Sequence, residues 1–147
     1  MIIITSDGTE NKHIAEGVGR KLGVRIFPPY FAIGFATDDK RPMAAAIFNE
    51  FNGSNIELTI WAEKGKITKG IIQTIANYVF NQLKCRRLTV RTKKRNKTVQ
   101  ELALRYGFTY EHVVKRYFPD DHAVVFRMYP EDCRWLKRER NASALAA

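Results

Sequence analysis

Cysteine and histidine are scarce in this sequence, which has two cysteines and three histidines among its 147 residues. Cys85 and Cys133 lie far apart and form no CxxC pair, so the sequence contains no zinc-binding motif and we expect no metal site. It also offers no framework of disulfide bonds. Such a composition is typical of a protein from a reducing compartment, and we expect a cytoplasmic location.

Long hydrophobic runs are also missing. No apolar stretch approaches the roughly 20 residues that a membrane-spanning helix requires, so no contact with a membrane is expected. Residues 1–12 lack the basic region and the small-residue cleavage site of a secretory signal. The length predicts a single domain over residues 1–135, and we expect residues 136–147 to form a flexible tail.

Positive charge is present in excess, because 25 lysines and arginines against 15 acidic residues give a net charge of +10. This excess predicts attraction to a polyanion, which could be nucleic acid, an acidic protein or a polyphosphate cofactor. The basic residues are densest around Asn96, where the cluster consists of Arg91, Lys93, Lys94, Arg95 and Lys97. A solvated basic rim beside a turn would have the same composition, so charge alone does not choose among these partners.

Hydrophobic periodicity predicts an α+β protein with the element order β-α-β-β-β-α-β-α-β-β. We expect residues 2–5 to form a short buried strand, and a helix then to end at Gly23, since glycine favours the backbone conformation that follows a helix. The remaining strands are expected within 30–37, 43–51, 55–63, 86–92, 108–118 and 122–130, and the remaining helices within 71–83 and 97–107.

One connection in this order determines where a ligand is expected. A strand at 56–62, a helix and a strand at 87–92 form a βαβ unit, whose two strands are parallel. The loop 62–70, with the sequence AEKGKITKG, therefore lies at the carboxyl end of a strand and at the start of a helix. Free backbone N–H groups and the helix dipole favour an anion at such a place, and we expect a phosphate there.

The segment CRRLTVRTKKRNKTVQELALRYGF, residues 85–108, resembles the GNAT superfamily of acyl-CoA-dependent N-acyltransferases. In that family a strand leads to an asparagine, and a helix follows that ends in Gly-Phe. The resemblance extends over about residues 30–130 and implies a mixed, mostly antiparallel central sheet with a parallel βαβ core and flanking helices.

The next segment, TYEHVVKRYFPDDHAVVFRMYPEDCRWL, resembles the closing part of the branch that acylates protein N-termini and antibiotics. Its ending, MYPEDCRWL, is similar to GNAT proteins encoded by bacteriophages and prophages. The implied function is transfer of an acetyl group from acetyl-CoA, the co-substrate, to an amine.

The family pattern also implies a set of cofactor-binding residues. One strand would pair its backbone with the pantetheine arm, the next loop would hold the pyrophosphate, and an asparagine would form a further hydrogen bond. The usual loop pattern is Arg/Gln-x-x-Gly-x-Gly/Ala; here GKITKG has threonine at the middle glycine and glycine at the Arg/Gln. The corresponding residues are Thr59, Ile60, Trp61, Lys66, Thr68, Lys69, Gly70 and Asn96.

In the implied mechanism a neutral amine attacks the thioester, so a base has to take its proton. Glu57 is the first candidate, because several GNAT enzymes carry a glutamate on this central strand. His112 and Tyr117, on the strand after the Gly-Phe pair, are the other catalytic candidates. Many GNAT enzymes supply an acid from a tyrosine four residues before that glycine, where Ala103 stands here.

Two other functions remain open at this stage. A basic nucleic-acid-binding protein would explain the charge, and YFAIGF, residues 30–35, has aromatic residues spaced for base stacking on a sheet. A catalytically inactive GNAT-fold adaptor would explain the altered loop. If the protein is an enzyme, its amine acceptor is unidentified, and the positive charge favours a protein or a nucleic-acid-associated target over small cationic amines. A monomer or a homodimer is expected.

Overall fold

The computed structural model of the protein describes residues 1–5 and 8–136. It has the predicted order of elements, and only Leu136 of the tail expected at 136–147 lies within the described residues. The elements are β1 (Ile2–Thr5), α1 (Gly8–Leu22), β2 (Tyr30–Ala36), β3 (Pro42–Asn49), β4 (Asn55–Ala62), α2 (Lys69–Ala76), β5 (Arg87–Lys93), α3 (Lys97–Arg105), β6 (Thr109–Phe118) and β7 (Asp121–Met128).

Seven strands form one sheet in the order β1-β2-β3-β4-β5-β7-β6. Strands β4 and β5 are parallel, as the βαβ unit predicts, and the other neighbouring strands are antiparallel. The protein is therefore a mixed α+β protein with a mostly antiparallel sheet.

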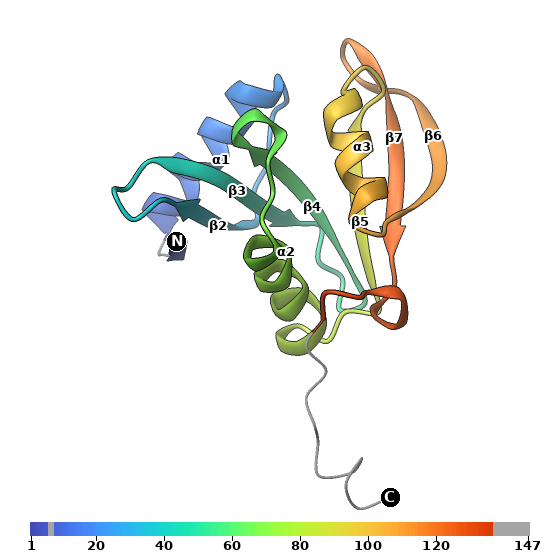
Figure 1. The fold of residues 1–147 in the computed structure, drawn as a ribbon. Coiled ribbons are helices and arrows are strands. Elements are labelled where there is room, and N and C mark those ends of the chain that lie inside the picture. The colour runs from blue at the N-terminus through green and yellow to red at the C-terminus, as the bar shows by residue number, and fades with distance from the viewer. Residues whose placement is uncertain (6–7, 137–147) are drawn as a thin grey trace, which may run out of the picture.

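Strands β4 and β5 separate part of the way along their length. Their pairing runs from Asn55 opposite Arg87 to Leu58 opposite Val90. Beyond that point β4 continues beside β3 as far as Ala62, while β5 continues beside β7 as far as Lys93. The two strands diverge toward the top of Figure 1, and β4 has no strand partner on this side from Thr59 onward.

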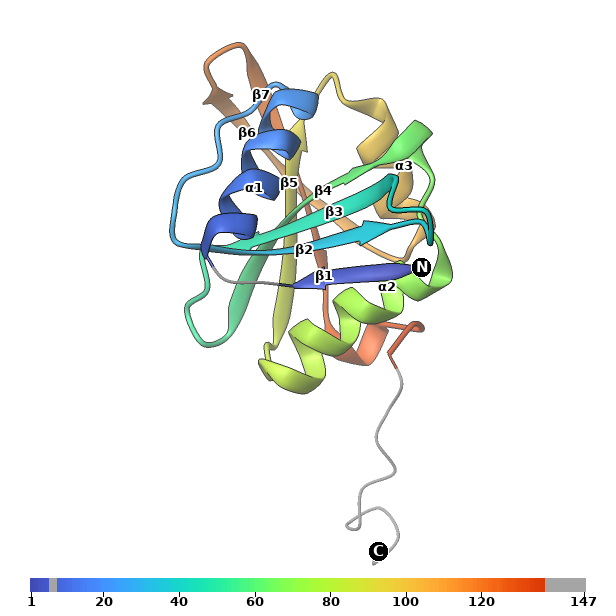
Figure 2. The same cartoon turned by 90° about the vertical axis from the view of Figure 1, so that its left-hand side faces the viewer.

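The helices cover both faces of the sheet. Figure 2 shows α1 across one face, with α2 and α3 on the other. Ile56, Leu58 and Ile60 of β4 are buried in the larger core with α2 and α3. Trp61 packs in a smaller core with residues of α1. The predicted alternation of β4 is thus confirmed.

Side-chain caps start both of the later helices. The Thr68 hydroxyl accepts a hydrogen bond from the Ile71 N–H (3.3 Å), and Asn96 Oδ1 accepts one from the Val99 N–H (3.2 Å). Each satisfies a backbone donor that the first helical turn leaves without a partner. The helix expected at 71–83 is present as α2, which continues as a π-helical turn at Asn77–Gln82.

The prediction of a buried strand at residues 2–5 was wrong in part. Residues 2–5 form a strand, but Ile3 and Ile4 are exposed, because β1 is the outermost strand and pairs only with β2. Of the aromatic residues of β2 considered for base stacking, Phe35 is buried in the core, Phe31 packs against Tyr78, and Tyr30 is partly buried.

None of the helices in the described residues has the length and the apolar character needed to cross a membrane. The same part of the chain contains no cluster of histidine, cysteine and carboxylate side chains that could hold a metal ion.

Candidate functional site

A cavity of about 630 Å³ lies where β4 and β5 separate. Its walls come from these two strands, from the segment that follows α1, from the turn between β6 and β7, and from the start of α3. The volume is within the range of small-molecule sites, which are commonly formed by a few polar groups on mostly apolar walls. The separation of the two strands thus opens a cavity that several of the predicted residues line.

Glu57 lines this cavity from β4, and its side chain is only 16% exposed. Burial raises the pKa of its carboxyl group above the ordinary 4.5, because the charged form loses water, while the nearby Arg91 guanidinium acts in the opposite direction. Glu50, at the end of β3, adds a like charge that also raises this pKa. A carboxylate of raised pKa is a stronger base than one in water.

Arg91 connects Glu57 with a second predicted residue. Its Nη1 group donates to Glu57 Oε1 in an ion pair and to the Tyr117 hydroxyl at 3.1 Å. The guanidinium also lies over the Tyr117 ring, 4.6 Å from Cζ to the ring centroid. Two of the three catalytic candidates are thereby brought together. From the sequence, Arg91 was predicted only as a member of the basic cluster; in the structure it lies on β5 between the buried residues Val90 and Thr92.

The Arg91 side chain has one buried N–H donor without an acceptor. Its Nε atom is buried and makes no hydrogen bond to any part of the chain that the structure describes. Most buried polar groups in proteins have a partner, because an unpaired one costs about 1–3 kcal/mol. The guanidinium therefore has hydrogen-bonding capacity that Glu57 and Tyr117 do not use.

His112 lies away from these residues. Its side chain is 52% exposed on β6, where Nδ1 is 3.8 Å from Glu111 Oε1, and it does not line the cavity. Register shifts in β6 at Tyr110/His112 and at Val114/Phe118 interrupt the alternation of the strand. The structure therefore does not bring His112 together with the other two catalytic candidates.

Two residues of the basic cluster form ion pairs with the turn between β6 and β7. Lys93 is only 9% exposed, and its Nζ donates to the Gly23 carbonyl (2.7 Å) and pairs with Asp120 (3.0 Å). Arg95 also pairs with Asp120, and its backbone N–H donates to Asp121. The charges of Lys93 and Arg95 are therefore paired within the protein, while Lys94 and Lys97 remain exposed.

Some of the predicted cofactor residues lie along the opening between the strands. Thr59 and Ile60 line the main cavity from the part of β4 that has no partner toward β5. A second cavity of about 220 Å³ continues between the end of β4 and α3, and is lined by Ile60, Trp61 and Asn96 among others. Asn96 borders both cavities, with its Oδ1 occupied by the cap of α3.

The remaining cofactor residues gather at the start of α2. Lys66, Thr68 and Lys69 are exposed, and Gly70 is half-buried in the first turn. None of them borders either cavity. They surround the first N–H groups of a helix, which is the arrangement expected of an anion site.

The tyrosine at the end of α3 has a structural role. The Tyr106 hydroxyl donates to the Ile67 carbonyl (2.6 Å), and its ring packs against Trp135. Tyr106 thus holds the segment before α2 against α3. Ala103, at the position of the usual GNAT tyrosine, is buried and offers no acidic group.

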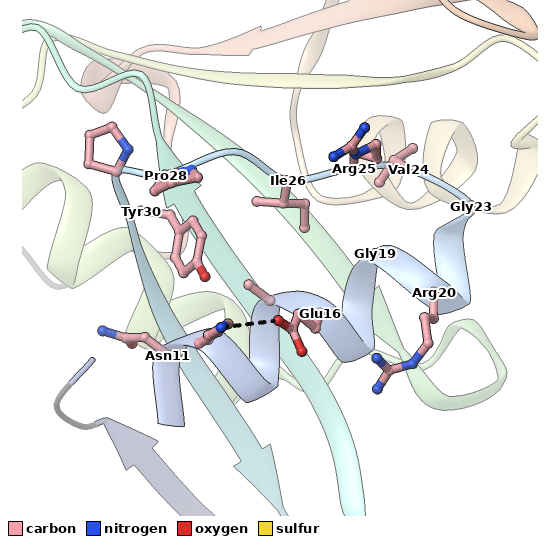
Figure 3. Close-up of a pocket in the computed structure, with 13 residues that line it drawn as sticks. Asn11, Glu16, Gly19, Arg20, Gly23, Val24, Arg25, Ile26, Pro28 and Tyr30 are labelled. Carbon is pink, nitrogen blue, oxygen red and sulfur yellow. Dashed lines mark ion pairs between the residues drawn. The ribbon is translucent and has the colours of Figure 1, made fainter. Parts of the chain in front are cut away.

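A larger hollow, of about 900 Å³, lies between α1 and residues 23–30. Figure 3 shows Tyr30 pointing into it toward α1, and the ion pair of Glu16 with Lys12 at its edge. None of the predicted site residues lines it. The segment from Gly23 to Ile26 borders both this hollow and the main cavity, and so forms the wall between them.

Comparison with known proteins adds evidence on the fold. No protein-family model matches the sequence, and no curated protein matches it. A variant of the spermidine N-acetyltransferase SpeG from Vibrio cholerae superposes with a TM-score of 0.73 at 9% identity, over 89% of this chain and 96% of that one.

Two further solved structures are similar. A dodecameric spermidine N-acetyltransferase from Vibrio cholerae has a TM-score of 0.71 at 12% identity, over 88% of this chain and 94% of that one. A protein from the same organism, assigned as a ribosomal-protein-serine acetyltransferase, has a TM-score of 0.61 at 21% identity, over 69% of this chain and 64% of that one. At such identities the similarity shows the fold. This chain therefore has the GNAT acetyltransferase fold, with the separated parallel strands at its centre.

Proposed function

We propose that the protein is an N-acetyltransferase that uses acetyl-CoA and an amine acceptor. The observation that supports this most directly is the position of Glu57, a buried carboxylate of raised pKa in the cavity between the separated strands. The structural neighbours named above are acetyltransferases, which supports the same class of reaction.

The residues around the opening fit a CoA thioester. From Thr59 to Trp61 the backbone of β4 has no strand partner toward β5, and its free N–H and C=O groups match the amides of a pantetheine arm. The start of α2, with Lys66 and Lys69 beside it, suits a pyrophosphate. The Asn96 amide, next to both cavities, can donate from its nitrogen while its oxygen caps α3.

Acetyl-CoA supplies a thioester whose carbonyl carbon forms a bond to the amine nitrogen as the carbon–sulfur bond breaks. Glu57 accepts the proton that the amine loses, which its raised pKa favours. Arg91 holds the Glu57 carboxylate and the Tyr117 hydroxyl in place, because its Nη1 group donates to both. Tyr117 is the group in the cavity that can give a proton to the departing thiolate.

The first experiment measures cofactor binding by calorimetry at moderate salt. Acetyl-CoA is compared with CoA that lacks the 3′-phosphate. We expect acetyl-CoA to bind with a micromolar dissociation constant and the second ligand to bind more weakly, because Lys94 and Lys97 remain exposed beside Asn96. If acetyl-CoA does not bind, the proposed function is wrong.

The second experiment tests Glu57 as the base. Glu57→Gln keeps the shape of the side chain and removes its ability to accept a proton, so we expect turnover to fall by about 100-fold or more while acetyl-CoA affinity is retained. Glu101→Gln, on the exposed side of α3, is the matched control and should keep full turnover. Full turnover in Glu57→Gln would assign the base to another group.

An inactive GNAT-fold adaptor is the second candidate. It is favoured by Ala103 in place of a catalytic tyrosine and by the ion pair that occupies Glu57. The calorimetric experiment separates the two candidates, because an adaptor that has lost its catalytic function has no need to retain acetyl-CoA affinity.

A further inference from the structure

Two ion pairs line the main cavity, together with Arg25 and Glu50. Glu57 pairs with Arg91, and Lys93 pairs with Asp120. A buried ion pair is costly to break, because removal of one partner leaves the other charge without water and without a counter-charge. An acceptor that enters this cavity therefore has to leave each of these charges with a partner.

A simple cationic amine does not satisfy this condition. Its ammonium group would pair with Glu57 and would draw the carboxylate away from Arg91, whose side chain is mostly buried. The Arg91 guanidinium would then lose its counter-charge. An acceptor with an ammonium group and a carboxylate can enter between Glu57 and Arg91 and give a counter-charge to both.

Arg91 also has the donors that a carboxylate requires. Its Nη1 serves Glu57 and Tyr117, while the buried Nε has no acceptor in the described residues. A guanidinium binds a carboxylate best through two parallel N–H groups, and the present contacts leave one edge of this guanidinium unused. Arg91 lines the cavity, and a guanidinium with unused donors there suits an anionic group of a ligand.

The walls beside this pair indicate the rest of the acceptor. The end of α1 contributes Leu22 to the cavity, the segment after it contributes Ile26 and Phe27, and the end of β6 contributes Phe118. These four apolar side chains suit an aliphatic or aromatic group, and the same walls also carry Arg25 and Glu50.

We propose that the acceptor is a free α-amino acid with an apolar or aromatic side chain, bound through its ammonium group by Glu57 and through its carboxylate by Arg91. This inference rests on the proposed acetyltransferase function and names its substrate class. The bound ammonium group first loses one proton to water and becomes the neutral amine. The amine nitrogen then forms a bond to the acetyl carbon as the carbon–sulfur bond breaks, and it passes a second proton to Glu57. The CoA thiolate takes a proton from Tyr117 and leaves as the thiol. The product is an anion without an ammonium group, so it loses its pairing with Glu57 and can leave.

The test compares three acceptors that share the phenethylamine skeleton in a thiol-release assay: phenylalanine, its methyl ester and phenethylamine. Phenylalanine has the carboxylate, and the other two compounds lack it. We expect kcat/KM for phenylalanine to exceed that for either of the others by about 10- to 100-fold, the range for one charge-assisted contact. The amine of the ester is less basic and therefore more reactive at neutral pH, so chemistry alone would favour the opposite order.

Arg91 variants assign this preference to a residue. Arg91→Met should reduce the ratio of kcat/KM between phenylalanine and its ester to near one. Arg91→Lys keeps the positive charge and loses the planar guanidinium, so it should give an intermediate ratio. It also serves as the test variant if Arg91→Met does not fold. Arg87→Met breaks a neighbouring ion pair, with Glu111, outside the cavity, and should leave the ratio unchanged.

The outcomes separate this inference from the proposed function. Absence of acetyl-CoA binding would refute the function and the inference together. Binding of acetyl-CoA with equal or better use of the ester, of phenethylamine or of spermidine would refute the inference alone. So would acetyl-CoA binding with no acetylation of any of these amines.

Discussion

The buried ammonium group of Lys93 provides the sharpest test of how the cavity is held together. It connects two walls that are far apart in the sequence, because it binds the Gly23 carbonyl at the end of α1 and Asp120 in the turn after β6. We expect Lys93→Met to loosen both walls while it keeps a side chain of similar length in the same space.

The size of the effect follows from these contacts. A hydrogen bond from a charged donor contributes about 1.5–3 kcal/mol. The loss of the Asp120 contact adds little, because that carboxylate is half-exposed and keeps Arg95 as a partner. Burial of methionine instead of an ammonium group offsets part of the loss, so we expect the free energy of unfolding to fall by about 1–2 kcal/mol. The melting temperature should then fall by about 2–8 °C.

Urea denaturation followed by circular dichroism measures this change, and hydrogen exchange locates it. Amides of residues 23–29 should exchange faster in Lys93→Met than in the wild-type protein. Lys94→Met is the matched control, since Lys94 is an exposed neighbour that lacks these side-chain contacts. Equal stability of the two variants, or unchanged exchange at 23–29, would refute the role assigned to Lys93.

Four further predictions concern acid–base behaviour and backbone geometry. Because Glu57 has a raised pKa and has to be deprotonated to act, kcat should fall as the pH is lowered, with a midpoint above 4.5 that Glu57→Gln abolishes in a pH–rate profile. The Arg87 guanidinium lowers the pKa of Glu111 in the folded protein, so this ion pair stabilises the fold above pH 4.5. Its contribution is lost as the pH falls through the lowered pKa of Glu111. Glu111→Gln should therefore flatten that part of a plot of unfolding free energy against pH. Gly65 has a φ of +67° and its Cβ would lie 2.9 Å from a side chain of α3, so Gly65→Ala should lower the unfolding free energy by about 1–3 kcal/mol in urea titrations. Asn96→Ala should lose both the α3 cap, about 1 kcal/mol of stability, and acetyl-CoA affinity, whereas Asn96→Ser should lose only the affinity; equal stability of the two variants would contradict the cap.

Local patterns were sufficient to predict the order of the elements. The alternation of Ile56, Leu58 and Ile60 fixed the faces of β4, and glycines at 23 and 107 fixed the ends of two helices. The parallel relation of β4 and β5 followed from the helix between them. These features depend on residues close together in the chain, which periodicity can detect.

The candidate site could be predicted only in part. Glu57 and Tyr117 were named as separate candidates, but the Arg91 side chain that joins them pairs across 34 and 26 residues of sequence. The partner of Lys93 lies 27 residues away, so its burial was not visible in a stretch that reads as a surface cluster. The register shifts in β6 likewise depend on its pairing with β7. Strict alternation along the strand therefore could not predict that Tyr117 lines the cavity and His112 does not.

The short parallel ladder between β4 and β5 also bears on how the chain assembles. The β2–β3–β4 meander and the β6–β7 hairpin join neighbouring segments, whereas the ladder from Asn55 to Leu58 has to recruit a strand about thirty residues further along. Closure of such a loop costs entropy before its contacts form, so we expect the two halves to acquire structure first and this seam to form late. The cavity lies at that seam. Mild heating or denaturant should therefore open the seam before either half unravels, and loss of ligand binding would be the earliest sign of unfolding.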